Sequence, residues 1–141
     1  MLDSTERETP RIKVLVEAPV PYSFSVREAS VLSECDVTRC TGPLTGRDCP
    51  ILAGTPCPKV NSADVVVFDL GLDTETGRQL LVELKRLHPE VAPVVLAWRA
   101  DRIRYTQLLQ GCQAVTFPWT LTKLQAAIHS ASVRARHDRR L

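Results

Sequence analysis

Short apolar runs alternate with amphipathic segments along the chain. The clearest run, residues 64–70, is nearly continuous in valine, phenylalanine and leucine, which is typical of a strand covered on both faces. Leucines then recur with helical spacing from Leu80 to Leu87, and Pro89 lies where such a helix should end. The same patterns predict further strands at 12–16, 37–40, 91–96 and 114–117, and further helices at 25–32, 101–110 and 121–131.

Strands and helices that alternate in this way predict βαβ units. We therefore expect one α/β domain, a doubly wound five-stranded parallel sheet of the flavodoxin-like type in the order 2-1-3-4-5. The segment 41–61 holds four prolines and three glycines, so the helix before the third strand should be reduced to a turn. Residues 1–10 are interpreted as a polar tail, 11–133 as the domain and 134–141 as a basic tail.

The composition is that of an ordinary globular protein, with 44% hydrophobic and 24% charged residues and a net charge of +2. This charge is too small to indicate a nucleic-acid partner, and the basic tail is better explained as a solvated helix end. No apolar run approaches the ~20 residues that span a bilayer, and the polar N-terminus does not resemble a signal peptide. These features predict a cytoplasmic protein with no membrane or nucleic-acid partner.

The predicted strands end in Glu17, Asp69, Trp98 and Phe117. These ends should meet at one edge of a parallel sheet, where ligands and chemistry gather. An aspartate at that edge can act as a nucleophile toward a phosphoryl donor if a cation neutralises the phosphoryl oxygens. The alternative, which we favour for Asp69, is a side chain that caps the following loop.

Asp69 is followed by Asp73 four residues later and by Gly77 eight residues later, where an amphipathic helix begins. This resembles the signature of receiver domains of bacterial response regulators, in which the phosphoacceptor aspartate is followed by proline at +4 and glycine at +8. The segments HPEVAPVVL and LLQGCQAVTFPWTLTKLQAAI resemble the approach to that family's fourth strand and its fifth strand, corner and last helix. The resemblance covers 11–133 loosely and 63–128 well, and it makes Asp69 the phosphoacceptor candidate.

Several groups that such a domain uses for phosphoryl chemistry are missing. The family usually has an acidic pair that holds Mg²⁺ together with the phosphoacceptor; here only Glu17 is present, so magnesium binding should be weak. Phosphoryl transfer depends mostly on positioning and charge neutralisation, so we expect no efficient phosphorylation. The replaced positions are Ala97 or Trp98 for a Ser or Thr hydroxyl, Phe117 for a lysine, and Asp73 for the proline, which adds a negative charge to the acidic pocket.

Five cysteines without a secretion signal favour reduced thiols. Cys49 and Cys57 lie eight residues apart in the proline-rich segment. They are unrelated loop thiols in the simplest interpretation, or a redox pair, or, with Cys40, ligands of a metal or haem, which is the least favoured. Cys35, Cys40 and Cys112 are expected to be small buried side chains, and His88, His129 and His137 are expected on the surface.

Trp98 and Trp119 lie at the exits of the last two predicted strands. With Phe117 they would form an apolar surface, and we expect at least one exposed ring in a protein interface. The alternative is that both rings pack onto the neighbouring helices as peripheral core. The preferred interpretation is a stand-alone receiver-like domain that is not an enzyme, holds no cofactor and acts through protein contacts, a homodimer among them. The alternatives are a working phosphoacceptor domain that uses Asp69, and a redox or metal sensor based on the Cys49 and Cys57 loop.

Overall fold

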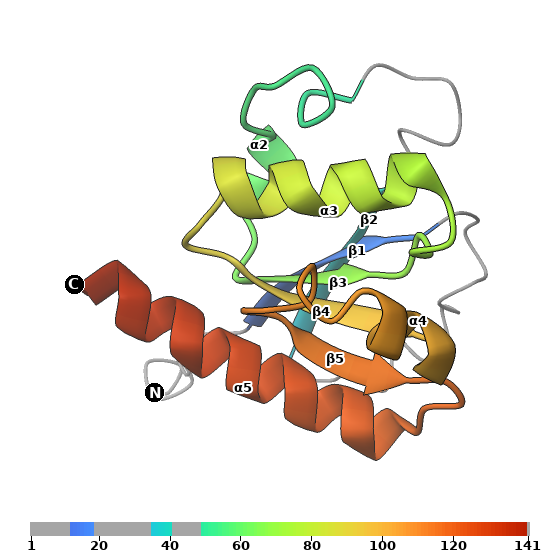
Figure 1. The fold of residues 1–141 in the computed structure, drawn as a ribbon. Helices are drawn as coiled ribbons and strands as arrows, with labels where there is room; N and C mark the ends of the chain where they lie inside the picture. Colours follow the sequence, from blue (N-terminus) through green and yellow to red (C-terminus); the bar gives the residue numbers. More distant parts are fainter. Residues whose placement is uncertain (1–11, 19–34, 41–48, 141) are drawn as a thin grey trace.

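The computed structural model describes residues 12–18, 35–40 and 49–140, with side chains as far as Arg134. The described strands form one parallel sheet in the order β2-β1-β3-β4-β5, with helices on both faces (Figure 1), so the predicted fold class and strand order are confirmed. The strands are β1 (Ile12–Glu17), β2 (Cys35–Cys40), β3 (Val65–Phe68), β4 (Ala92–Ala97) and β5 (Gln113–Thr116). The helices are α2 (Pro58–Asn61), α3 (Glu75–Leu87), α4 (Arg99–Arg104) and α5 (Leu121–Arg140).

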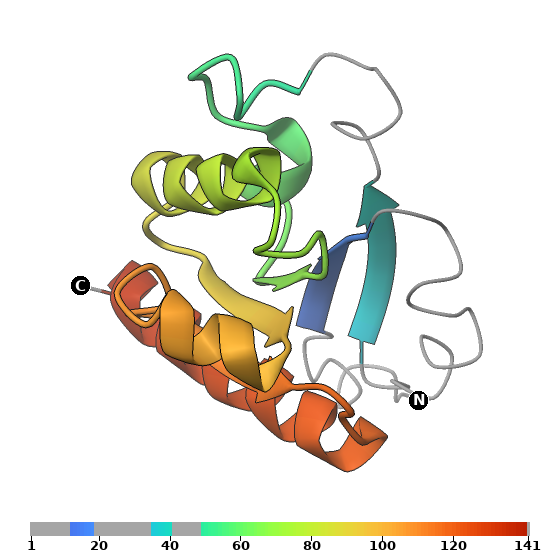
Figure 2. The same ribbon diagram turned by 45° about the vertical axis from the view of Figure 1, so that its right-hand side comes forward.

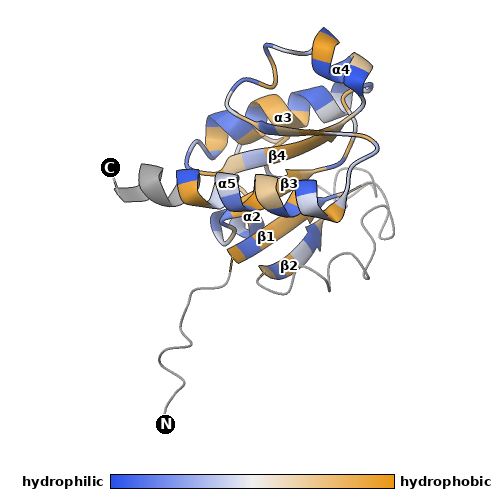
Figure 3. Cartoon of the chain, turned by 90° about the horizontal axis from the view of Figure 1, so that it is seen from below, coloured by the Kyte–Doolittle hydropathy of each residue, from blue (hydrophilic) through white to orange (hydrophobic). Residues whose placement is uncertain are grey.

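Alternating side chains of the strands build two apolar layers. On one face, Val67 and Leu96 belong to a cluster with Leu124 and Ile128 of α5. On the other face, Phe68 belongs to a cluster with buried residues of α2 and α3. Figure 2 shows α3 and α5 on opposite sides of the sheet, and Figure 3 shows that both helices carry apolar and polar positions. Within the described residues, no helix is long and apolar enough to cross a membrane.

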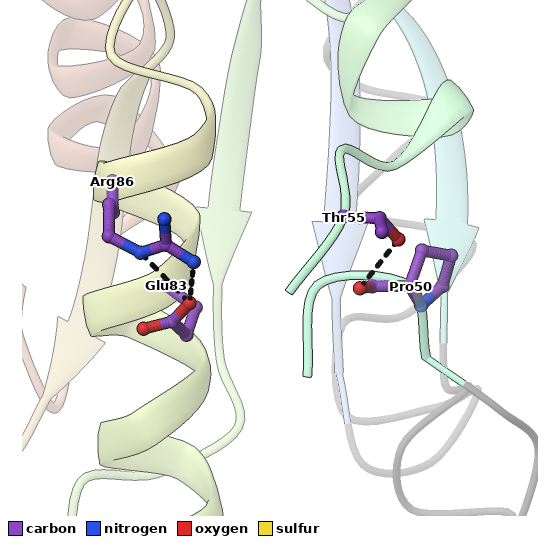
Figure 4. A network of polar contacts seen from close by, with 4 residues as sticks. All are labelled: Pro50, Thr55, Glu83 and Arg86. Carbon is purple, nitrogen blue, oxygen red and sulfur yellow. Dashed lines mark hydrogen bonds and ion pairs between the residues drawn. The ribbon is translucent and has the colours of Figure 1, made fainter. Parts of the chain in front are cut away.

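The proline-rich segment forms turns and the short helix α2 in its described part, 49–61. The Thr55 hydroxyl donates a hydrogen bond to the Pro50 carbonyl at 3.0 Å, which closes one of these turns (Figure 4). Ile51 and Val60 are buried and attach the segment to the core. The predicted reduction of this helix is therefore confirmed for the described part. Residues 41–48 and the predicted helix at 25–32 lie outside the described residues.

Helix α4 is shorter than the helix predicted at 101–110, because residues 105–111 form turns. The Thr106 hydroxyl donates to the carbonyl oxygens of Arg102 and Ile103, both at 2.9 Å. Such a bond from a threonine to the preceding turn competes with the regular backbone pattern. Ile103 follows the apolar spacing of the predicted helix, but its side chain is 68% exposed. Helix α5, in contrast, extends past its predicted end.

Candidate functional site

The carboxyl ends of four strands lie along one edge of the sheet. The backbone N–H of Asp69 donates to the carbonyl of Glu17 at 2.8 Å, which joins the ends of β1 and β3. The N–H of Phe117 donates to the carbonyl of Ala97 at 3.0 Å, which joins the ends of β4 and β5. Because β3 also pairs with β4, the residues that the sequence assigns to this edge lie along one row of strand ends.

The loop after Asp69 is held by contacts with the first turns of α3. Asp69 is partly buried, and Leu72, three residues later, is buried. The Arg78 guanidinium donates to the Leu72 carbonyl at 2.8 Å and to the Tyr105 hydroxyl at 3.1 Å, and it lies 5.2 Å from the centre of the Tyr105 ring. Asp73 is exposed, so its negative charge lies in solvent.

Gly77 packs directly against this loop. Its N–H donates to the Thr74 hydroxyl at 3.1 Å, which caps the start of α3. A Cβ atom at position 77 would lie 2.1 Å from the carbonyl oxygen of Gly71. Gly71 itself has a φ of +86°, a conformation that glycine adopts readily. Gly77 is therefore required by the close approach of the loop and the helix, and Gly71 by its left-handed backbone conformation.

Glu17 ends β1 but its side chain contacts β2. The residue is 3% exposed, and its register partner in the neighbouring strand is Cys40. The Cys40 thiol donates a hydrogen bond to the carboxylate, whereas Oε2 has no hydrogen-bond partner. Burial raises the pKa of Glu17 from 4.5 to about 7, although the bond from Cys40 and the charge of Lys59 oppose the rise.

Aromatic side chains occupy the ends of β4 and β5. The rings of Trp98 and Phe117 lie 4.9 Å apart at a tilt of 35°. Trp98 is 60% exposed, whereas Trp119 is partly buried and packs against the core cluster beneath α5. The peptide bond between Phe117 and Pro118 is cis. These two strand ends present aromatic surface beside Ala97, where a phosphoryl pocket would need a hydroxyl and an ammonium group.

Receiver domains of known structure resemble this chain over most of its length. A response regulator receiver domain protein from Clostridium thermocellum is 22% identical, with a TM-score of 0.64 over 89% of this chain and 98% of its own. The receiver domain of the Francisella response regulator 1452 is 15% identical, with a TM-score of 0.61 over 91% and 99% of the two chains. The signal receiver domain of an HD domain-containing protein from Pseudomonas fluorescens is 16% identical, with a TM-score of 0.65 over 94% of each. This chain has the receiver-domain fold. No protein-family model and no curated protein sequence matches it.

The carboxyl groups at this edge of the receiver fold do not fit a magnesium site. The Glu17 carboxyl is buried and hydrogen bonded to a thiol, and burial favours its neutral form. The next residue, Ala18, has no side-chain oxygen, whereas Mg²⁺ requires oxygen ligands in near-octahedral array. β1 therefore supplies no suitable second carboxylate for an ion at Asp69.

A cation that the sequence pattern does not predict lies beside β5. Arg102 of α4 donates a hydrogen bond to the hydroxyl of Thr116 at the end of this strand. Two grooves of about 610 and 340 Å³ flank β5, and Arg102 lines both of them. Arg99 lines the larger groove and Lys123 the smaller, and no acidic side chain lines either one. Arg102 could not be assigned from the sequence because its direction depends on where the short helix α4 begins.

His88 is buried rather than on the surface, contrary to the prediction. It is 1% exposed, and its Nε2 accepts a hydrogen bond from the backbone N–H of Cys57 at 2.9 Å. A neutral imidazole that accepts at Nε2 carries its proton on Nδ1. That atom lies 3.6 Å from Glu90 Oε1 and has no hydrogen-bond partner. The sequence does contain a signal, because position 88 lies four residues after Leu84 on the buried stripe of α3.

Cys49, Cys57 and Cys112 are free thiols. Cys35 is buried as expected, whereas Cys40 and Cys112, which were also expected to be buried, are only half-buried. Burial raises the pKa of the Cys112 thiol, against the opposing charges of nearby Lys85 and Arg134. In the described part of the chain, no three His, Cys, Asp or Glu side chains form a group that could hold a metal ion. A redox or metal role for Cys49 and Cys57 remains a prediction.

Proposed function

We propose that this chain is a receiver-like signalling module that acts through contacts with a partner protein and accepts phosphoryl groups at Asp69 poorly. The observation that carries the proposal is the aromatic pair of Trp98 and Phe117 at the strand ends beside Ala97. It occupies positions where neutralising and hydrogen-bonding groups would be needed.

The missing groups matter because a protein accelerates phosphoryl transfer almost entirely by positioning the reactants and neutralising their charge. The attacking carboxylate and the phosphoryl oxygens are all negative, so the site must supply cations and donors. Phe117 offers neither, and Glu17 directs its side chain to Cys40. Arg102 is engaged with Thr116. Ala97, Glu17 and Phe117 therefore do not supply the charge and hydrogen-bond donors that stabilise the transition state.

The surface that supports a partner contact runs from Trp98 along α4 to β5. Trp98 and Ile103 are 60% and 68% exposed. Ile103 lines the larger groove together with Arg99 and Arg102, and Lys123 lines the smaller one. Large apolar and arginine side chains are enriched in interfaces, and the excess of cations favours a partner surface that carries carboxylates.

The phosphorylation prediction is tested with acetyl phosphate and Mg²⁺. We expect the intact mass of the protein to stay unchanged over minutes, because Ala97 and Phe117 cannot neutralise the phosphoryl oxygens and Arg102 is engaged with Thr116. The matched control is Asp69→Asn under the same conditions. Stoichiometric gain of one phosphoryl group by the natural chain, but not by the Asp69→Asn variant, would refute the proposal and favour a working phosphoacceptor.

The interface prediction is tested with two separate tryptophan variants. Trp98→Ala should change the free energy of unfolding by less than ~1 kcal/mol, because the ring is largely exposed. Trp119→Ala should lose about 2–3 kcal/mol, because its ring packs against the core beneath α5. Urea titration measures both, and sedimentation and binding to captured partners measure association. If folded Trp98→Ala associates as strongly as the natural chain, Trp98 is not part of the interface.

A further inference from the structure

The Glu17 carboxyl and the Cys40 thiol form a buried pair that the proposed signalling role does not use. They are register partners at the ends of β1 and β2. Cys40 is half-buried, and its thiol donates to the carboxylate of Glu17, whose Oε2 has no hydrogen-bond partner. A buried carboxylate with spare acceptor capacity therefore faces a thiol that is not fully enclosed.

We propose that Cys40 is a modification site, a thiol oxidised by small hydroperoxides with Glu17 as the group that takes and returns its proton. The thiol proton passes to the carboxylate, and the sulfur attacks one oxygen of the hydroperoxide. The S–O bond forms as the O–O bond breaks, and the leaving alkoxide or hydroxide takes the proton back from Glu17. Sulfur is oxidised by two electrons to a sulfenic acid, the peroxide is reduced to an alcohol or water, and Glu17 ends unchanged.

The surroundings of the pair favour this transfer. Burial raises the pKa of Glu17 to about 7, much closer to the ~8.5 of an ordinary thiol than an exposed carboxyl would be. A carboxyl with such a pKa both accepts and returns a proton near neutral pH. The ammonium of Lys59 on α2 acts on the same carboxylate, and a lysine beside a thiol–carboxylate pair stabilises the negative charge that the two share.

A groove lies on the same face of the sheet as the pair. A groove of about 430 Å³ is lined by Leu15, Thr38 and Lys59. Leu15 and Thr38 are register partners two residues before Glu17 and Cys40, so their side chains point to the same face as the pair. The groove therefore ends two register positions before the pair, on the face of the sheet where a small, uncharged hydroperoxide would have to approach the thiol.

The inference does not depend on how the domain contacts its partner, and it is tested by trapping the sulfenic acid. The natural chain is treated with hydrogen peroxide and dimedone, and labelling of each cysteine is followed by peptide mass spectrometry. We expect Cys40 to be labelled at least ~10-fold faster than Cys112. Cys112 is the matched control, because it is also half-buried near cations but has no recorded carboxyl partner. A peroxide-dependent disulfide that includes Cys40 counts as labelling, since it forms from the sulfenic acid.

Two variants separate proton transfer from simple exposure. Glu17→Gln should slow Cys40 labelling at pH 7 by about 10-fold or more. The pH profile should move too: the natural chain gains rate as Glu17 ionises near pH 7, whereas the variant gains rate only as the thiol itself ionises. Lys59→Gln changes an exposed residue and should keep the fold; it should slow labelling by roughly 3-fold. The proposal would be overturned by equal labelling rates for Cys40 and Cys112. It would also be overturned by an unchanged rate and pH profile in folded Glu17→Gln. If Glu17→Gln does not fold, an unchanged labelling rate in Lys59→Gln would overturn it.

Discussion

Replacing Gly77 by alanine should lower the free energy of unfolding by about 2 kcal/mol. The added Cβ would lie 2.1 Å from the carbonyl oxygen of Gly71 and 3.0 Å from the Thr74 hydroxyl. The first of these atoms belongs to the backbone, so the loop after Asp69 must move to admit it. Such overpacking costs about 1–3 kcal/mol. The higher helix propensity of alanine stabilises the folded state by up to ~1 kcal/mol. We expect this gain to be smaller than the destabilisation caused by the clash.

The matched control for Gly77→Ala is Thr76→Ala, which changes the exposed neighbouring position in the same turn of α3. This control should stay within ~0.5 kcal/mol of the natural chain. Urea denaturation monitored by circular dichroism measures both variants. Equal stability of the two variants would show that the loop and the helix do not approach as closely in solution as they do here.

The stability of the fold should fall as the pH rises through the titration of Glu17. Burial raises the pKa of this carboxyl in the folded state from 4.5 to about 7. Between these values the folded state keeps a proton that the unfolded chain has released, so raising the pH favours unfolding. At 1.36 kcal/mol per pH unit, the full effect approaches about 3 kcal/mol above pH 7 and vanishes below pH ~4.5.

The Glu17→Gln variant isolates this effect, because its amide does not titrate. Relative to the natural chain, the variant should gain about 3 kcal/mol of stability between pH 4.5 and pH 8. Any pH-independent effect of the amide on stability changes the difference between the two proteins by the same amount at pH 4.5 and at pH 8, so it does not affect this gain. Urea titrations of the two proteins at matched pH values measure the difference. A difference that stays constant across this range would mean that Glu17 ionises as freely when folded as when unfolded.

The order of the sheet and the position of the site could be predicted because both depend on local patterns. The apolar run that ends at Asp69 predicts a strand buried on both faces, and the rule for strand ends then places Glu17, Asp69 and Phe117 along one edge. At least one exposed ring was predicted among Trp98 and Trp119, and the ring of Trp98 is exposed. These predictions needed only the period of the side chains and the sequence of elements.

The partners of the buried polar groups could not be predicted, because they depend on contacts between distant segments. The thiol that bonds Glu17 is fixed by the register of β1 and β2, which is not visible in either strand alone. The same holds for His88 and the backbone of Cys57, 31 positions apart. The extent of α4 was also wrong, because the chain leaves the helix after Arg104 and continues in turns in which the Thr106 hydroxyl bonds the preceding carbonyls.

The hydrogen bond from the Cys57 N–H to His88 fixes the C-terminal part of the proline-rich segment against the end of α3. Cys57 immediately precedes α2, and His88 immediately follows α3, so the bond joins the start of one helix to the end of the next. The residues at 53–56 before this point are exposed, and closing a slightly longer loop costs little entropy. A short insertion after Thr55, beyond the turn that its hydroxyl closes, should therefore be tolerated, whereas loss of the contact between Cys57 and His88 should not. The segment thus offers a site for attaching a reporter or a tag without displacing the sheet.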